Sequence, residues 1–143
     1  MAELTALNTL DLVFQIAISL LLIYGFVLFR YQKNLRGHAI AFAVATLLNA
    51  VSVILLMLLP FFIEANELAT GFVDAHLILL LVHHSIGLVV LALSLFIVLR
   101  WAMNGFKPKA CRGKKLMYWT LITWAAALLL GITLYLNDSG LIQ

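Results

Sequence analysis

A long apolar stretch of the chain, residues 75–101, reads AHLILLLVHHSIGLVVLALSLFIVLRW. A helix needs about 20 consecutive, mainly apolar residues to cross the hydrocarbon of a bilayer. Backbone N–H and C=O groups in lipid must bond within their own segment, so a run of this kind can span a membrane only as a helix. The stretch therefore predicts a transmembrane helix.

Three further runs have the same character. The sequence predicts four membrane-spanning helices, over about 10–29, 38–63, 74–101 and 116–136. Because short connections force consecutive helices to run antiparallel, we predict an all-α polytopic membrane protein with an antiparallel four-transmembrane-helix bundle. Residues 1–143 form its single domain.

The composition supports lipid as the solvent of this surface. Of the 143 residues, 65% are hydrophobic and 10% are charged, whereas a soluble domain carries about a quarter charged residues. The single cysteine excludes an intramolecular disulfide and a CxxC metal motif. The sequence holds no nucleophile–base arrangement and no phosphate-binding glycine loop, so an enzyme is not indicated.

The charges separate along the chain. All nine Lys and Arg fall in or beside the segments 30–37 and 100–115, and the six acidic residues lie toward the other side. The positive-inside rule then predicts that both basic loops are cytoplasmic and both termini are outside, in the cell (cytoplasmic) membrane. The basic loops also suit anionic lipid or an acidic partner, and nucleic acid is not predicted as a partner.

Polar and small residues mark the helix faces that pack together in lipid. At helical spacing each predicted helix has one inward face. These faces carry Asp11, Gln15 and Ser19 in the first helix; His38, Ala41, Ala45, Asn49 and Ser52 in the second; His76, His83, Gly87 and Ser94 in the third; and Thr120, Trp124, Ala127, Gly131 and Tyr135 in the fourth. Trp101 is expected at the membrane–water interface, as belt residues are.

The histidines are the main candidates for a site, because ionisable residues inside a span are costly. His83 and His76 are predicted to face inward, whereas His84 faces another helix or a partner protein, outside the core stripe. We assign His84 and Asn49 to interfaces. The alternative is a neutral His83, hydrogen-bonded to Asn49 or Ser52.

A metal ion is weakly indicated, with His76, Asp74 and Asp11 as candidate ligands, because no HxxxH or HExxH pair is present. Haem is easier to accommodate, since its iron needs only one or two axial ligands. The cofactor candidates are His83, His76 and His38, with haem b ahead of copper; a chain without cofactor is the third possibility.

Several features together are similar to a known family. A basic turn ends in a histidine (Arg36-Gly37-His38), a third helix carries Leu80-Leu81-Val82-His83, and a basic linker precedes a fourth helix with Trp124, Gly131 and Tyr135. Over about residues 30–136 the chain resembles the YozB/CtaM-like family of small four-helix membrane proteins. Members often carry a histidine in that linker, where this chain has Cys111-Arg112-Gly113.

The resemblance implies an accessory or assembly subunit of a respiratory membrane complex such as a terminal oxidase, handling haem or copper. His38 and His83 match the histidines of the family. Two alternatives remain open from the residues: a small b-type cytochrome or quinone-reactive electron carrier, and a purely structural subunit of a membrane complex.

Overall fold

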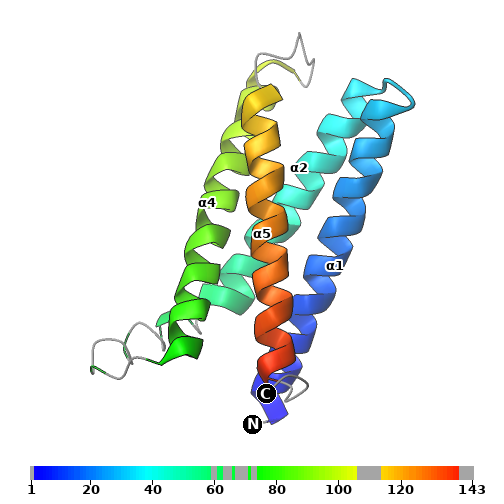
Figure 1. The fold of residues 1–143 in the computed structure, drawn as a ribbon. Coiled ribbons are helices and arrows are strands. Elements are labelled where there is room, and N and C mark those ends of the chain that lie inside the picture. Colours follow the sequence, from blue (N-terminus) through cyan, green and yellow to red (C-terminus); the bar gives the residue numbers. More distant parts are fainter. Residues whose placement is uncertain are drawn as a thin grey trace.

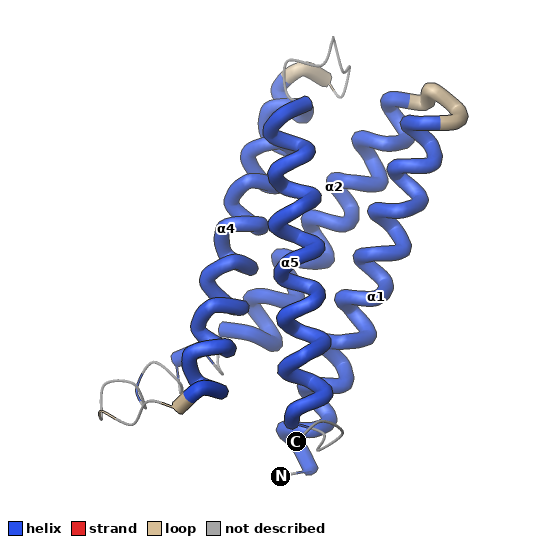
Figure 2. The backbone as a smooth tube through the Cα atoms, viewed as in Figure 1, coloured by secondary structure: helices blue, strands red, loops and turns tan. Residues whose placement is uncertain are grey.

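The computed structural model describes residues 2–58, 61, 62, 66, 71, 74–105 and 114–138, with the side chains of 2–8, 114 and 138 excepted. Within this part the chain is helical and contains no strand (Figures 1 and 2). The elements are α1 (Ala2–Arg30), α2 (Leu35–Ser52), the π turn η1 (Val53–Met57), α4 (Ala75–Met103) and α5 (Lys114–Asp138). Four helices are long and apolar enough to cross a membrane, which fits an integral membrane protein.

The four predicted helices are present, but their ends differ from the prediction. The first begins at Ala2 rather than near residue 10, because Ala, Glu and Leu favour a helix even where the apolar run has not begun. The second begins at Leu35, where the Asn34 side chain caps the helix by accepting from the Gly37 N–H at 2.9 Å. Asp74 caps α4 in the same way, accepting from the Leu77 N–H at 2.7 Å.

The second helix is not one regular α-helix as far as residue 63. It changes at Val53–Met57 into a π turn, where the Leu58 N–H bonds the Val53 carbonyl. Residues 61 and 62 are helical again, while 59, 60 and 63 lie outside the described residues. Single π turns inside helices are rare and are frequently found at functional positions.

Helices α1 and α2 form an antiparallel hairpin with polar contacts at two levels. The Ser52 hydroxyl donates to the Asp11 carboxylate at 2.5 Å, and His38 Nδ1 lies 2.9 Å from the Gly25 carbonyl oxygen. The residue numbers add up to 63 in both pairs, so the register is constant between the two levels.

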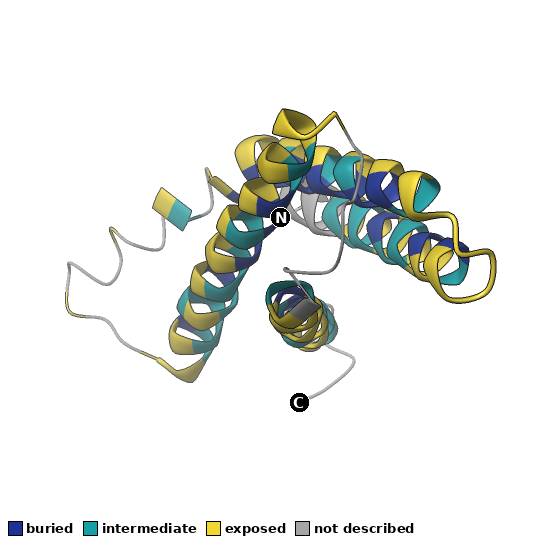
Figure 3. Ribbon diagram, turned by 90° about the horizontal axis from the view of Figure 1, so that it is seen from above, coloured by how far each residue is buried: buried dark blue, intermediate teal, exposed yellow. Residues whose placement is uncertain are grey.

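Helices α4 and α5 form the second hairpin, and the two hairpins pack through α2 with α4 and α1 with α5. The core cluster draws on all four helices and consists of Ile18, Phe42, Ala45, Val90, Ile97 and Trp124. Seen from above, buried residues face the other helices and exposed ones cover the outside (Figure 3). Much of that outside is apolar, as contact with lipid requires.

The inward faces of the second and fourth helices agree with the prediction. Buried residues there include Ala41, Ala45, Asn49, Ser52, Thr120, Trp124 and Ala127. On α4 only Ser94 of the predicted stripe is buried, and its buried neighbours are instead Leu77, His84, Val90 and Ile97. The stripe is displaced because α4 lies between α2 and α5 and packs against both.

Candidate functional site around His38

His38 lies in the first turn of α2 and is tied to α1. Its Nδ1 lies 2.9 Å from the carbonyl oxygen of Gly25. A carbonyl oxygen can only accept a hydrogen bond, so Nδ1 carries the proton of the neutral ring and donates it. The lone pair of the neutral imidazole is therefore on Nε2.

Gly25 makes this contact possible because it lets the two backbones approach closely. A Cβ atom at position 25 would lie 3.2 Å from the Ala41 Cβ and 3.6 Å from His38 Nδ1. Any larger side chain would push α1 away from α2 and lengthen the bond to the carbonyl. The pair Gly25 and Ala41 thus sets the helix separation that fixes the His38 ring.

Aromatic rings surround His38 and link all four helices. The ring centroid of Phe29 lies 5.3 Å from that of His38, and the centroid of Trp101 lies 6.0 Å away. Trp101 also contacts Phe42 at 5.6 Å, and Phe42 contacts Trp124 at 6.4 Å. Trp101 is therefore turned toward the interior at this end, rather than serving only as a residue of the membrane interface.

His38 Nε2 is buried and has no hydrogen-bond partner among the described residues. Leaving a buried polar atom unsatisfied costs about 1–3 kcal/mol. Histidines that ligate metals usually donate their other ring N–H to a carbonyl or carboxylate, which fixes the tautomer and the ring orientation. His38 meets this condition, with Nε2 as the atom that would bind.

The other candidate histidines lie far from His38. Trp101, which contacts His38, is 18 residues from His83 on α4, which is about 27 Å along the axis. One iron therefore cannot take both His38 and His83 of one chain. His76 is a further seven residues away, toward the start of α4.

The side chains of His83 and His84 point from α4 toward different neighbouring segments. The His83 ring packs on α5, where a Cβ at Gly131 would lie 2.9 Å from His83 Cε1. His84 is 9% exposed and its ring lies 5.8 Å from that of Phe61. His84 thus faces another helical segment, which is the first of the two alternatives predicted for it, and it belongs to the buried residues of α4.

Asp11 and Asp74, assigned to a metal, and Ser52, assigned to a hydrogen bond with His83, have other partners. Asp11 accepts from Ser52, and Asp74 caps α4. Asn49 is 4% exposed, and its Nδ2 has no partner among the described residues. Within the described ranges no group of three or more His, Cys, Asp or Glu could hold a metal ion. Glu67 and Cys111 lie outside these ranges.

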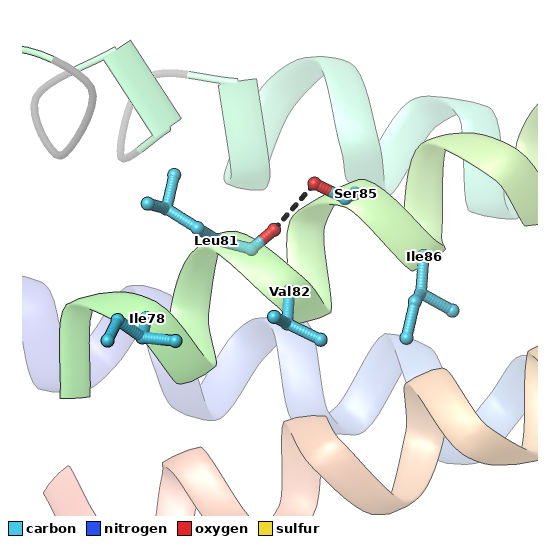
Figure 4. A pocket seen from close by; sticks show the side chains of 5 residues that line it. All are labelled: Ile78, Leu81, Val82, Ser85 and Ile86. Carbon is cyan, nitrogen blue, oxygen red and sulfur yellow. Dashed lines mark hydrogen bonds between the residues drawn. The ribbon is translucent and has the colours of Figure 1, made fainter. Parts of the chain in front are cut away.

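An open depression on the surface of α4 is lined mainly by apolar side chains. It is lined by Ile78, Leu81, Val82, Ser85 and Ile86 (Figure 4). The Ser85 hydroxyl donates to the carbonyl of Leu81 at 2.7 Å, so its proton is engaged within the helix. This surface suits lipid chains rather than a polar ligand.

Comparisons with protein-family models, curated proteins and solved structures found no match to this chain. The similarity to the YozB/CtaM-like family therefore stays a prediction. Sequence reasoning missed Gly25 and the inward position of Trp101. The available signal was the glycine itself, since a glycine inside a transmembrane helix often marks a close helix contact.

Proposed function

We propose that this chain is an accessory or assembly subunit of a respiratory membrane complex, of the terminal-oxidase type, and that His38 is its haem ligand. The observation that carries the proposal is the His38 ring itself. Nδ1 is engaged by the Gly25 carbonyl, and the buried Nε2 has no partner among the described residues. A ligand bound to Nε2 would remove the cost of that unsatisfied atom.

Haem suits this arrangement better than a single metal ion does. A copper or zinc ion needs several protein ligands around it, whereas haem iron needs one or two axial ligands and an apolar surrounding. Phe29, Trp101 and Phe42 supply apolar surface at this end. Since Nε2 is buried, binding requires neighbouring side chains to turn aside. A bound haem would supply a one-electron iron centre.

A role in delivery or assembly is favoured over a permanent electron carrier. Stable b-type sites commonly use two axial histidines, and His38 and His83 are about 27 Å apart along the axis. A single protein ligand holds haem less firmly, which suits transfer to a partner subunit. The partner contacts would use the apolar faces that the bundle leaves exposed.

The charge distribution supports the proposed orientation in the cytoplasmic membrane. Arg30, Lys33, Arg36 and Arg100 lie at the helix ends opposite Asp11 and Asp74. By the positive-inside rule this end faces the cytoplasm, and both termini face outward. His38 would then accept haem from the cytoplasmic side.

Titration of haem b into the detergent-solubilised chain tests the ligand. We expect the Soret band of the added haem to shift from the position of free haem to that of a histidine-ligated haem, and this shifted band to be lost in His38→Gln. Glutamine can keep a donor toward the Gly25 carbonyl but has no ring nitrogen lone pair, so the variant separates ligation from folding. His83→Gln is the matched control and should keep the band. A Soret band that stays at the position of free haem with the unchanged chain, or an equally shifted band with His38→Gln, would contradict the proposal.

The cellular role needs its own test. Deletion of the protein should lower terminal-oxidase activity and oxidase haem content, and the unchanged chain should restore both. His38→Gln should be expressed in the membrane yet fail to restore them. Oxidase activity and haem content that do not change on deletion would exclude the accessory role.

A further inference from the structure

Exposed basic residues collect at one end of the bundle. They come from all four helices or the turn between the first two, and they are Arg30, Lys33, Arg36, Arg100 and Lys115. We call these five residues the basic rim. The acidic residues whose side chains are described, Asp11 and Asp74, lie at the opposite end. The rim therefore has no acidic partner close by within the described part of the chain.

The aromatic contacts of His38 bring parts of this rim together. Phe29, next to Arg30, and Trp101, next to Arg100, both contact the His38 ring. Three helix ends from the two hairpins thus meet at one level. The basic residues on these helix ends carry charge of the same sign at one end of the bundle, so they repel each other, and a bound anion would offset this repulsion.

We propose that the basic rim binds the headgroups of anionic phospholipids in the leaflet that it faces, and that these lipids stabilise the junction of the two hairpins. In such a lipid the phosphate is not neutralised by a positive charge in the same headgroup. This phosphate would lie between the basic side chains of α2 and α4. The proposal does not depend on haem or on the orientation of the chain.

The position of the rim along the helices favours lipid as the occupant. The membrane-spanning segments end at Arg30 and Met103 and begin at Leu35 and Lys115, so the rim lies at the level of the headgroups. Long basic side chains keep their apolar stems along the helix and extend their charge to this level. Each Lys or Arg near an anionic surface contributes about 1 kcal/mol, which is about a fivefold change in affinity.

The test measures thermal unfolding of the full chain in phosphatidylcholine nanodiscs with increasing phosphatidylglycerol. We expect phosphatidylglycerol to raise the unfolding temperature. The phosphatidylglycerol content that gives half of this rise should be about fivefold higher in Arg100→Gln. Added salt should weaken the effect. Lys33→Gln is the matched control. It also removes one positive charge, but from the turn between α1 and α2, at a residue that is not next to a ring in contact with His38. We therefore expect a smaller change in the half-maximal phosphatidylglycerol content.

Three results would overturn the proposal. Equal unfolding temperatures in both lipids would exclude binding of anionic headgroups. Equal effects of Arg100→Gln and Lys33→Gln would mean diffuse attraction without a site at the junction. Stabilisation by soluble inorganic phosphate in pure phosphatidylcholine, as large as that by phosphatidylglycerol, would identify a free anion as the ligand in place of the lipid.

Discussion

Two glycines on the second hairpin allow one packing contact to be measured by itself. A Cβ at Gly131 on α5 would lie 2.9 Å from His83 Cε1, whereas a Cβ at Gly87 on α4 would meet nothing within 4 Å. Carbon atoms pack best at about 3.5–4.0 Å, so alanine at 131 must displace the His83 ring. Alanine at 87 displaces nothing.

Both substitutions gain the same helix propensity, since alanine is favoured over glycine by about 1 kcal/mol in a helix. The difference between them therefore isolates the steric contact. Overfilling a packed site costs about 1–3 kcal/mol. Because the His83 ring is half-buried and can turn on its two side-chain torsions, we expect Gly131→Ala to be less stable than Gly87→Ala by about 1 kcal/mol, the lower end of that range.

The assay is reversible unfolding in mixed micelles with increasing sodium dodecyl sulfate, followed by far-UV circular dichroism. The same pair of substitutions is then measured in a His83→Ala background, where the ring that Cβ would meet is gone. The difference between the two glycine sites should vanish there. Equal stability of Gly131→Ala and Gly87→Ala, or a difference that survives without the His83 ring, would refute this packing of α4 on α5.

Three further outcomes follow from the first hairpin. A double-mutant cycle of Asp11→Ala and Ser52→Ala should give a coupling of about 0.6–1.7 kcal/mol, as hydrogen bonds between membrane helices do; additive effects would mean that the pair contributes nothing. Asn49→Leu should leave unfolding free energy unchanged or raise it by about 1 kcal/mol, because the buried Nδ2 lacks a partner in the described residues; a loss of stability in the same micelle assay would show that this amide is bonded. Gly25→Ala should weaken the contact between His38 and the Gly25 carbonyl and be less stable than Gly87→Ala by about 1 kcal/mol, and an unchanged chemical shift of His38 Nδ1 by nitrogen NMR would count against this.

Hydrophobicity predicted the larger features of the fold because it is summed over many residues. Four apolar runs are enough to predict four spanning helices, and the small and polar residues of the second helix gave its buried face, including Ala45 and Asn49. The start of α1 was missed because residues 2–9 are helical by propensity rather than by hydropathy. A propensity estimate summed over that segment would have found it.

The finer geometry depends on single contacts, which a pattern cannot specify. Adjacent residues on a helix point about 100° apart, so the sequence alone could not decide how His83 and His84 divide between two neighbouring helices. The π turn at Val53–Met57 also changes the phase of the second helix up to Leu58, which no regular period would predict. The burial of His84 next to Phe61 is likewise a single contact.

Helices α1 and α2 meet at three levels that are seven residues apart on each helix. From one end to the other, these levels hold Asp11 with Ser52, Ile18 with Ala45, and Gly25 with His38. Seven residues of a straight α-helix fall about 20° short of two full turns. The hairpin therefore keeps all three levels facing only if its helices wind around each other as a left-handed coiled coil.

This repeat limits how the hairpin can change length. One residue inserted between Ile18 and Gly25 would rotate Asp11 by about 100° away from Ser52, while Gly25 would still face His38. Only insertions of a whole repeat in both helices preserve every contact, and each repeat adds about 10 Å to the span. A membrane of fixed thickness does not admit that addition, so variation in length is expected in the turn between Arg30 and Leu35 or outside residues 11–52.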